Sequence, residues 1–186
     1  MAWTMGTPRI IAISGTPGSG KTSLCDALES AKIQCERLQE LAQRYECLGS
    51  VDEHDGAAPV DIHRLAEVWE PPSSGLVMVD GHLAHLLDIE AIIVVRCEPK
   101  ELSQRLNARG YDEAKIRANT EWELMAGTWA ELLEFEVDLP VLELNSSEHS
   151  VEELASLVLE WVEKGCQALP LSTMADSAID WLSQSE

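Results

Sequence analysis

Residues 15–22 read Gly-Thr-Pro-Gly-Ser-Gly-Lys-Thr, which matches the G-x-x-x-x-G-K-[ST] pattern of a phosphate-binding loop. An apolar run rich in β-branched residues, at 9–14, precedes it and is typical of a buried parallel strand. After the loop, Leu24 and Leu28 lie one helical turn apart. A strand, a glycine loop and a helix in this order direct backbone N–H groups and a helix N-terminus at an anion. A turn that binds nothing would leave Lys21 beside the positive end of the helix without a counter-charge.

Size and composition fit one soluble α/β domain. The chain has 186 residues, of which 45% are hydrophobic and 25% charged, as in ordinary globular proteins. Its net charge of −20, from 13 basic and 33 acidic residues, argues against a surface that binds nucleic acid directly. It does not exclude ATP, because a phosphate pocket needs only a few local cations. We expect the acidic excess to serve solubility or a basic protein partner.

The cysteines and the hydropathy pattern indicate a cytoplasmic protein. The five cysteines form no C-x-x-C pair and no metal-ligand spacing with histidine, and their odd number fits a reducing cytosol. No apolar stretch approaches the roughly 18 residues of a membrane span. The N-terminus lacks the charged and apolar regions of a signal peptide. We therefore expect no membrane partner.

Apolar runs and helical periodicity alternate along the chain. Strands are predicted at residues 9–14, 33–36, 76–79, 91–95 and 139–144. Helices are predicted at about 22–28, 37–45, 61–69, 99–109, 113–134 and 151–163, with a loop at 49–59 and an amphipathic tail at 170–186. Apolar strands between helices predict a three-layer α/β fold with a parallel five-stranded sheet covered on both faces. The tail docks either on the core or on a partner, and its sequence pattern is compatible with both alternatives.

Polar residues follow the strand at 76–79, where a parallel sheet binds its ligands. Ligands of open parallel sheets lie outside the carboxyl ends of the strands, and Asp80 is the first charge after this strand. Its carboxylate can hold the Mg²⁺ that bridges ATP phosphates, directly or through water, beside the hydroxyl of Thr22. The alternative is that Asp80 caps the next short helix. His82 is either a catalytic or water-positioning residue or a structural one, and His85 is interpreted as structural.

Two arginines stand in the last part of the helix at 99–109. Arg105 and Arg109 lie four apart, a spacing that is unfavourable for like charges unless an anion sits between them. Glu101, one turn earlier, offers Arg105 an ordinary ion pair. Arg109 has no such neighbour and precedes Gly110, a hinge-like break. A mobile arginine that closes over a transferring phosphate would stabilise its charge and exclude water.

Other side chains near this break are assigned to structure. Lys115 and Arg117 are interpreted as a solvated face. Trp122 and Trp129 lie seven apart within the helix at 113–134, which is typical of a core seam rather than of an adenine-stacking platform. We assign neither tryptophan to a nucleotide base.

Four segments together resemble the adenylate kinase isoenzyme 6 family. They read Ile-Ser-Gly-Thr-Pro-Gly-Ser-Gly-Lys-Thr-Ser at 13–23, Val-Asp-Gly-His at 79–82, Arg-Leu-Asn-Ala-Arg-Gly-Tyr at 105–111 and Lys-Ile-Arg-Ala-Asn at 115–119. The resemblance implies a P-loop nucleoside monophosphate (NMP) kinase domain at 1–165. Within it, the NMP-binding segment is expected at about 37–60 and a very short lid at about 108–118. The tail at 166–186 matches no family segment that we recognise.

The resemblance also implies an activity and the residues that carry it. Family members transfer the γ-phosphate of ATP to AMP and related monophosphates, hydrolyse ATP, and assist small ribosomal subunit maturation and rRNA processing by engaging a ribosomal protein with a basic tail. With Mg²⁺ as cofactor held by Thr22 and Asp80, the expected catalytic residues are Lys21, Asp80, His82 and Arg109. The residues expected to contact ATP are Gly18, Ser19, Gly20, Lys21, Thr22, Ser23, Arg105 and Arg109.

One departure from the family pattern leaves alternatives open. Where relatives read Gly-Asp-Leu-Ala-Arg, residues 39–43 read Gln-Glu-Leu-Ala-Gln, and Arg44 comes one place late. An arginine at that point normally holds the acceptor phosphate. Besides an NMP kinase, the chain therefore fits a ribosome-assembly ATPase with little kinase activity. A third alternative is a kinase for another small metabolite, of the shikimate or dephospho-coenzyme A type, which the short Arg-Gly-Tyr lid disfavours.

Overall fold

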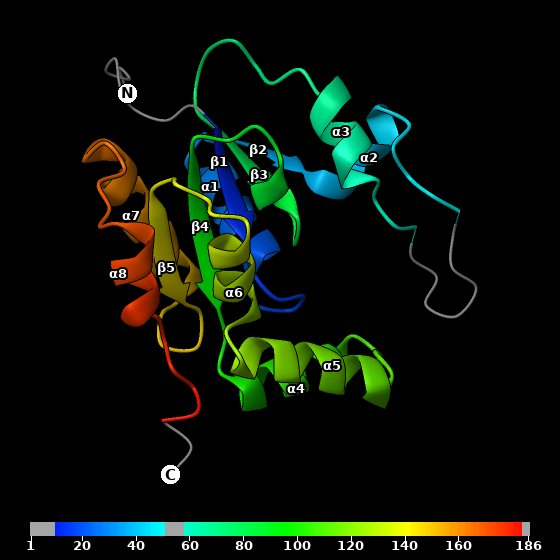
Figure 1. Ribbon diagram of the computed structural model, residues 1–186, viewed down its shortest axis with the longest axis vertical. Coiled ribbons are helices and arrows are strands. Elements are labelled where there is room, and N and C mark those ends of the chain that lie inside the picture. Colours follow the sequence, from blue (N-terminus) through cyan, green and yellow to red (C-terminus); the bar gives the residue numbers. More distant parts are fainter. Residues whose placement is uncertain (1–9, 51–57, 184–186) are drawn as a thin grey trace.

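The sheet has the predicted number of strands, and all of them are parallel. The computed structural model describes residues 10–50 and 58–183. Its strands are β1 (Ile10–Ser14), β2 (Gln34–Arg37), β3 (Val77–Asp80), β4 (Ala91–Arg96) and β5 (Val141–Asn145), in the order β2-β3-β1-β4-β5. The predicted three-layer α/β fold is confirmed (Figure 1). Because β1 is central and pairs with β3 and β4, the loop after β1 opens between the carboxyl ends of two neighbours.

Helices cover both faces of the sheet. One face is covered by α1 (Lys21–Ser30) and α7 (Val151–Glu163). The other is covered by α2 (Leu38–Arg44), α3 (Ile62–Val68), the short 3-10 helix η1 (Ala84–Leu86), α6 (Gly127–Glu134) and α8 (Leu171–Asp176). A hairpin of α4 (Pro99–Ala108) and α5 (Glu113–Leu124) lies beyond the carboxyl edge of the sheet (Figure 1). Within residues 10–50 and 58–183, no helix has both the length and the apolar composition to cross a membrane.

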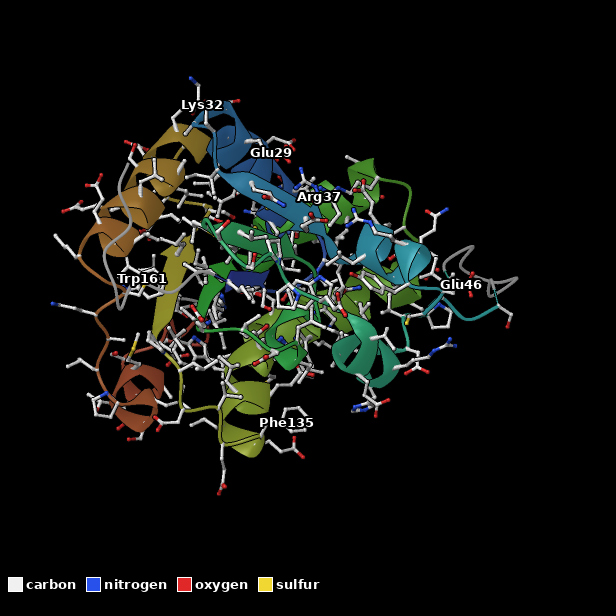
Figure 2. All side chains as sticks on the ribbon, turned by 90° about the horizontal axis from the view of Figure 1, so that it is seen from above. Glu29, Lys32, Arg37, Glu46, Phe135 and Trp161 are labelled. Atoms are coloured by element: carbon white, nitrogen blue, oxygen red, sulfur yellow. The ribbon has the colours of Figure 1, made fainter. Side chains whose placement is uncertain are left out.

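Alternate residues of a strand point into different cores, which is why the inner strands β1, β3 and β4 are almost wholly apolar. Ile11 and Ile13 of β1 pack in the core under α1 and α7. Ile10 and Ala12 pack in the core on the opposite face. Figure 2 shows side chains filling the space on both sides of the sheet, with Trp161 of α7 over one side. A strand buried on both faces gives the continuous apolar run that the sequence displays.

The single helix predicted at 113–134 is wrong, because the chain forms two helices there. α5 ends at Leu124 and α6 begins at Gly127. Between them, Ala126 adopts the left-handed conformation, with a φ of 51°. A Cβ atom on Gly127 would lie 2.2 Å from the ring of Trp122, so the second helix needs a glycine where it passes this indole.

The same break separates the two tryptophans that were expected to form one seam. Trp129 is buried in the core, and its indole N–H donates to Glu143 Oε1 at 2.6 Å. Trp122 meets His82 edge to face instead, with ring centroids 6.3 Å apart. The predicted seam is therefore wrong, since the two rings stand on different helices and have different neighbours.

The C-terminal tail docks on the core, a choice that its amphipathic pattern left open. Helix α8 packs on α6, and Leu171 and Met174 contact the core that contains Trp129. Beyond α8, Trp181 is buried, with 3% of its surface exposed. The tail is thus part of the folded domain in this structure.

Residues 126 and 127 should respond to substitution in opposite directions. Ala126→Gly removes the strain of an L-residue in the left-handed region and should raise the free energy of unfolding by about 1 kcal/mol. Gly127→Ala places a methyl group against the Trp122 ring and should lower that free energy by about 1–3 kcal/mol. Urea unfolding measures both changes. A stabilising Gly127→Ala or a destabilising Ala126→Gly would contradict the break as described.

Candidate functional site

The loop between β1 and α1 is so closely surrounded that two of its glycines are required. Gly15 has a φ of 137°, and a Cβ atom there would lie 2.3 Å from the carbonyl oxygen of Val95. Gly18 has a φ of 89°, and a Cβ atom there would lie 2.9 Å from Leu106. Both backbone conformations favour glycine. The loop is therefore confined between the end of β4 and the side chains of α4.

Lys21 begins α1 and is buried against the loop. Its ammonium group donates to the carbonyl oxygens of Gly15 and Thr16, at 2.8 and 2.9 Å. Burial lowers the pKa of Lys21 to about 8, and nearby carboxylates, Asp80 first among them, act in the opposite direction. Because both hydrogen-bond acceptors are neutral, the ammonium keeps a positive charge that a phosphate can balance.

Thr22 and Asp80 bring two oxygen atoms together beside the loop. The Thr22 hydroxyl donates to Asp80 Oδ2 at 3.0 Å. Burial raises the pKa of Asp80, while Lys21 and the hydrogen bond from Thr22 lower it. The following 3-10 helix has no side-chain cap, so Asp80 does not have the alternative role of capping it.

The oxygen atoms of Thr22 and Asp80 fit Mg²⁺, which prefers hydroxyl and carboxylate oxygens and keeps several water ligands. In the part of the chain that the structure describes, no three His, Cys, Asp or Glu side chains form a group that could hold a metal ion. A metal bound at Thr22 and Asp80 would therefore complete its ligand shell with water and with phosphate oxygens, as Mg²⁺ does in nucleotide sites.

The two histidines that follow β3 have different surroundings. His82 Nδ1 lies 3.3 Å from the carbonyl oxygen of Gly15, so the ring borders the loop. Since a carbonyl only accepts, Nδ1 carries the proton in this contact. Burial and the charge of Lys21 lower the pKa of His82, which favours the neutral ring. His85 is buried with Nδ1 3.1 Å from the Ser14 hydroxyl, as expected of a structural residue.

Arg105 connects α4 to the loop. Its guanidinium donates to the carbonyl oxygen of Ser19 at 3.3 Å and to the Ser146 hydroxyl at 3.0 Å. It also forms the ion pair with Glu101 that the sequence suggested, at 2.6 Å. Because protein atoms already engage these donors, the arrangement favours a role in positioning α4 on the loop over direct contact with a nucleotide.

Arg109 lies at the C-terminal end of α4 with an exposed side chain. Gly110 follows in the left-handed conformation, with a φ of 76°, and Asp112 caps the start of α5. The positive charge of Arg109 is among the causes that lower the pKa of Lys21, so the two cations lie within electrostatic reach of each other. An anion between them would relieve this repulsion.

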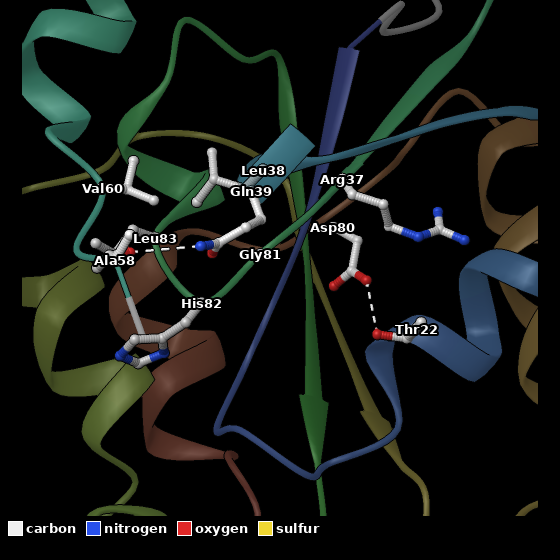
Figure 3. A pocket seen from close by; sticks show the side chains of 10 residues that line it. All are labelled: Thr22, Arg37, Leu38, Gln39, Ala58, Val60, Asp80, Gly81, His82 and Leu83. Atoms are coloured by element: carbon white, nitrogen blue, oxygen red, sulfur yellow. Dashed lines mark hydrogen bonds between the residues drawn. The ribbon is translucent and has the colours of Figure 1, made fainter. Parts of the chain in front are cut away.

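A cavity of about 370 Å³ adjoins the loop where β2 and β3 end (Figure 3). Its volume is in the range of small-molecule sites. The side chains that line it include Thr22, Arg37, Gln39, Asp80 and His82. Part of the predicted NMP-binding segment, 37–60, therefore borders the loop. Residues 51–57 of that segment lie outside the described part of the chain.

The arginine at this cavity is one that sequence analysis did not single out. Arg44, the arginine that comes one place late, pairs with Glu36 at 3.1 Å, and 57% of its side chain is exposed. Arg37, the last residue of β2, belongs to the cavity lining instead. Its Nη2 atom pairs with Asp26 at 2.7 Å, whereas its Nη1 atom is buried without a hydrogen-bond partner. In Figure 3, Arg37 lies on the side of the cavity nearest Thr22.

Sequence analysis also missed a group of buried charges next to the loop. Glu123 of α5 accepts a hydrogen bond from the Thr16 hydroxyl and pairs with Arg96 at 2.6 Å. Arg96 is the first charge in the apolar run of β4, the same signal that pointed to Asp80 after its strand. No comparable signal marks Glu123, which is a buried acid in a helix rich in exposed charges.

Curated relatives match nearly the whole chain. A protein of Archaeoglobus fulgidus named "Putative adenylate kinase" is 33% identical over 177 residues, which cover 95% of this chain and 94% of the relative. A protein of the same name from Pyrococcus abyssi is 33% identical and covers 93% of this chain and 97% of the relative. A match over 95% of the chain reaches into the segment after Gly165. The relatives therefore have a counterpart to part of the tail, which the sequence analysis did not recognise.

Solved structures share the fold. The structure of deoxyadenosine kinase from M. mycoides with bound dATP has a TM-score of 0.52 at 15% identity, covering 83% of this chain and 99% of that one. An uncharacterized protein from Eubacterium ventriosum has a TM-score of 0.51 at 12% identity, covering 83% of this chain and 98% of that one. The family described as AAA domain matches residues 11–126. By this match and by its identity to the archaeal relatives, the chain belongs to the P-loop family of the archaeal proteins named "Putative adenylate kinase".

Proposed function

We propose that this protein is a cytoplasmic, ATP-dependent NMP kinase of the adenylate kinase type, which converts ATP and AMP to two ADP. The observation that supports it most strongly is that a loop with a buried ammonium group adjoins a cavity of about 370 Å³. Thr22, at the end of the loop, and Asp80, at the end of β3, join the two, since they are hydrogen-bonded to each other and both line the cavity. A kinase needs such adjacency because the donor and acceptor phosphates must meet in line.

On the donor side, we assign the β- and γ-phosphates of ATP to the loop and to the N-terminus of α1. The residues assigned to them are Gly18, Ser19, Gly20, Lys21, Thr22 and Ser23. Backbone N–H groups and the Lys21 ammonium would neutralise the phosphate oxygens. Thr22 and Asp80 would hold Mg²⁺, which supplies charge neutralisation to the phosphates when it is bound.

Arg109 is proposed to close over the transferring phosphoryl group as part of a lid at about 108–118. Its exposed side chain and the glycine that follows suit a residue that moves. His82 is assigned to orient the attacking oxygen, since its ring lies where the loop meets the cavity. No covalent intermediate is needed, because positioning of the donor and acceptor and stabilisation of charge account for most of the catalysis of phosphoryl transfer.

On the acceptor side, we assign the NMP phosphate to Arg37. Guanidinium groups bind phosphate through paired, charge-assisted hydrogen bonds, and Arg37 has one buried donor without a partner. Its carboxylate partners Asp26 and Glu29 have 65% and 45% of their side chains exposed. Ion pairs with such exposed carboxylates contribute little, so a phosphate can compete for the guanidinium.

Lys21→Met tests the donor site. Loss of the ammonium should lower kcat/KM for ATP by at least about 100-fold, the scale of a lost transition-state charge contact. The fold should be retained, because methionine fills a similar volume and removes a buried charge. Lys164→Met, at an exposed lysine after α7, is the matched control and should keep full activity. Unchanged turnover of Lys21→Met in a coupled ADP assay would refute the donor site.

Arg37→Ala and Arg44→Ala test the acceptor site as a pair. Arg37→Ala should raise the KM for AMP by about 10-fold or more and leave the KM for ATP nearly unchanged, since a charged hydrogen bond to the acceptor is lost. Arg44→Ala should change neither value. Initial rates with varied AMP at saturating ATP measure the effect. If Arg44→Ala weakens AMP and Arg37→Ala does not, the family position holds the acceptor and the assignment to Arg37 is wrong.

A second candidate is an ATPase whose cycle switches a contact with a basic protein, such as a ribosomal protein during small-subunit maturation. The observation that favours it is the altered acceptor segment, in which Gln43 occupies the place of the usual arginine and Arg44 is engaged by Glu36. The net charge of −20 would suit a basic partner.

ADP formation with and without AMP distinguishes the two candidates. For the kinase, we expect consumption of ATP to depend on AMP and to yield two ADP for each ATP, because the phosphoryl group leaves on the acceptor. The ATPase would yield one ADP and free phosphate without AMP. If the rate of ATP consumption is the same with and without AMP, the kinase proposal is refuted and the second candidate takes its place. A panel of other acceptors in the same assay tests for a small-metabolite kinase.

A further inference from the structure

A buried carboxylate joins α5 to the phosphate loop, and the proposed reaction does not use it. Glu123 has 1% of its surface exposed, and its Oε2 atom accepts from the Thr16 hydroxyl. Its Oε1 atom accepts from Arg96 Nε at 2.6 Å, from the backbone N–H of Cys97 at 3.3 Å and from the indole N–H of Trp181 at 3.0 Å. A carboxylate removed from water depends on such donors, so its position follows theirs.

One of these donors comes from the C-terminal tail. Trp181 is buried, and its ring centroid lies 5.8 Å from the guanidinium carbon of Arg96. Two residues earlier, the backbone N–H of Ile179 donates to Glu143 at 3.0 Å, and its carbonyl accepts from Arg96 at 3.3 Å. Residues 179–181 of the tail are therefore held by charged side chains of β4, α5 and β5.

The other end of this chain of contacts is in the loop. The backbone carbonyl of Thr16 accepts from the Lys21 ammonium at 2.9 Å and from the backbone N–H of Ser19 at 3.1 Å. The Thr16 hydroxyl meanwhile binds Glu123. A displacement of Thr16 would therefore move the carbonyl that places Lys21. Phosphate sites are sensitive to such displacements, because their donors must match the ligand closely.

We propose that the docked tail sets the affinity of the loop for ATP through Glu123, a positioning residue between Trp181 and Thr16. The proposal rests on the proposed function only in that the loop binds ATP. With the tail docked, the donors from Arg96 and Trp181 hold Oε1 and leave Oε2 for Thr16. When the tail undocks, Glu123 loses the indole donor, gains access to water and no longer fixes Thr16. The loop then leaves its phosphate-binding shape more easily.

Thermodynamic linkage makes this coupling reciprocal. If docking of the tail favours ATP binding, bound ATP must favour docking by the same factor. A tail that only adds stability to the fold would show no such dependence on ATP.

The first test compares two tryptophans in the full-length chain. Trp181→Phe removes the N–H donor to Glu123 and keeps most of the buried ring. Trp161→Phe is the matched control, since Trp161 is also buried but packs in the core under α1 and α7, and its indole N–H donates to the backbone carbonyl of Gln167, at the start of the tail, at 2.9 Å and not to Glu123. By calorimetry, we expect Trp181→Phe to weaken ATP binding by about 5-fold or more and Trp161→Phe to stay within about two-fold of the wild type.

The second test starts from the loop. Thr16→Val removes the hydroxyl that binds Glu123 and should weaken ATP, whereas Thr16→Ser keeps the hydroxyl and should restore the affinity. In the Thr16→Val background, Trp181→Phe should have no further effect, because both changes break the same path. Hydrogen exchange in the tail of the wild-type protein should slow when ATP is added, and it should not slow in Thr16→Val.

The outcomes separate this proposal from the one on which it rests. If the wild type binds no ATP, both the proposed donor site and the proposed coupling are refuted. If the wild type binds ATP and Trp181→Phe binds it as tightly as Trp161→Phe does, the coupling alone is refuted and the tail is structural. If the effects of Thr16→Val and Trp181→Phe on the free energy of ATP binding are fully additive, the coupling is also refuted, because the two residues then act independently.

Discussion

A positive charge buried against the phosphate loop is the constraint on which the rest of the site depends. Lys21 is largely removed from water, and for that reason its pKa is lowered to about 8. An ammonium group that meets neutral carbonyls costs folding free energy, so the loop relies on its surroundings to keep its shape. Those surroundings come from distant parts of the chain: β4 confines Gly15, α4 confines Gly18 and α5 holds Thr16. The three-layer fold is what brings these elements to one edge of the sheet.

The inner strands β1, β3 and β4 could be predicted because burial on both faces requires a nearly uninterrupted apolar run, whereas the edge strand β2 reads Gln-Cys-Glu-Arg and has no such run. The apolar run at 76–79 also predicted that Asp80, the first charge after it, lies at the carboxyl edge of the sheet, where the structure has it beside Thr22. The break in the helix after Leu124 has a weaker signal in the sequence. Ala126 has no chemical preference for a left-handed φ, and Gly127 is needed only because the Trp122 ring lies against it. A glycine inside a helical pattern was the one available signal, and many helices tolerate it.

The cavity beside the loop shows a different limit of sequence reasoning. Arg37 lies opposite Asp80 in the register of β2 and β3, and this register is what brings it to the cavity. Register between parallel strands is not visible in one sequence, because long crossovers join the strands and fix no spacing. The family pattern directed attention to positions 43 and 44 instead. In this chain Arg44 pairs with Glu36, and the arginine that lines the cavity is Arg37.

The distribution of charge explains how a protein with a net charge of −20 offers a site for a polyanion. At a distance the acidic surface repels a phosphate, but salt screens such repulsion beyond about 8–10 Å. Close to the loop, Lys21 and Arg109 supply positive charges that are near enough to affect each other, and the carboxylates of Asp80 and Glu123 act on Lys21 in the opposite direction. Deeper in the molecule, Arg96 is almost fully buried between carboxylates. Buried ion pairs add little net stability, because desolvation offsets their attraction. The Arg96 and Glu123 pair instead fixes the orientation of the Glu123 carboxylate. The donors from Arg96 and Trp181 hold Oε1, so Oε2 is directed at Thr16 in the loop.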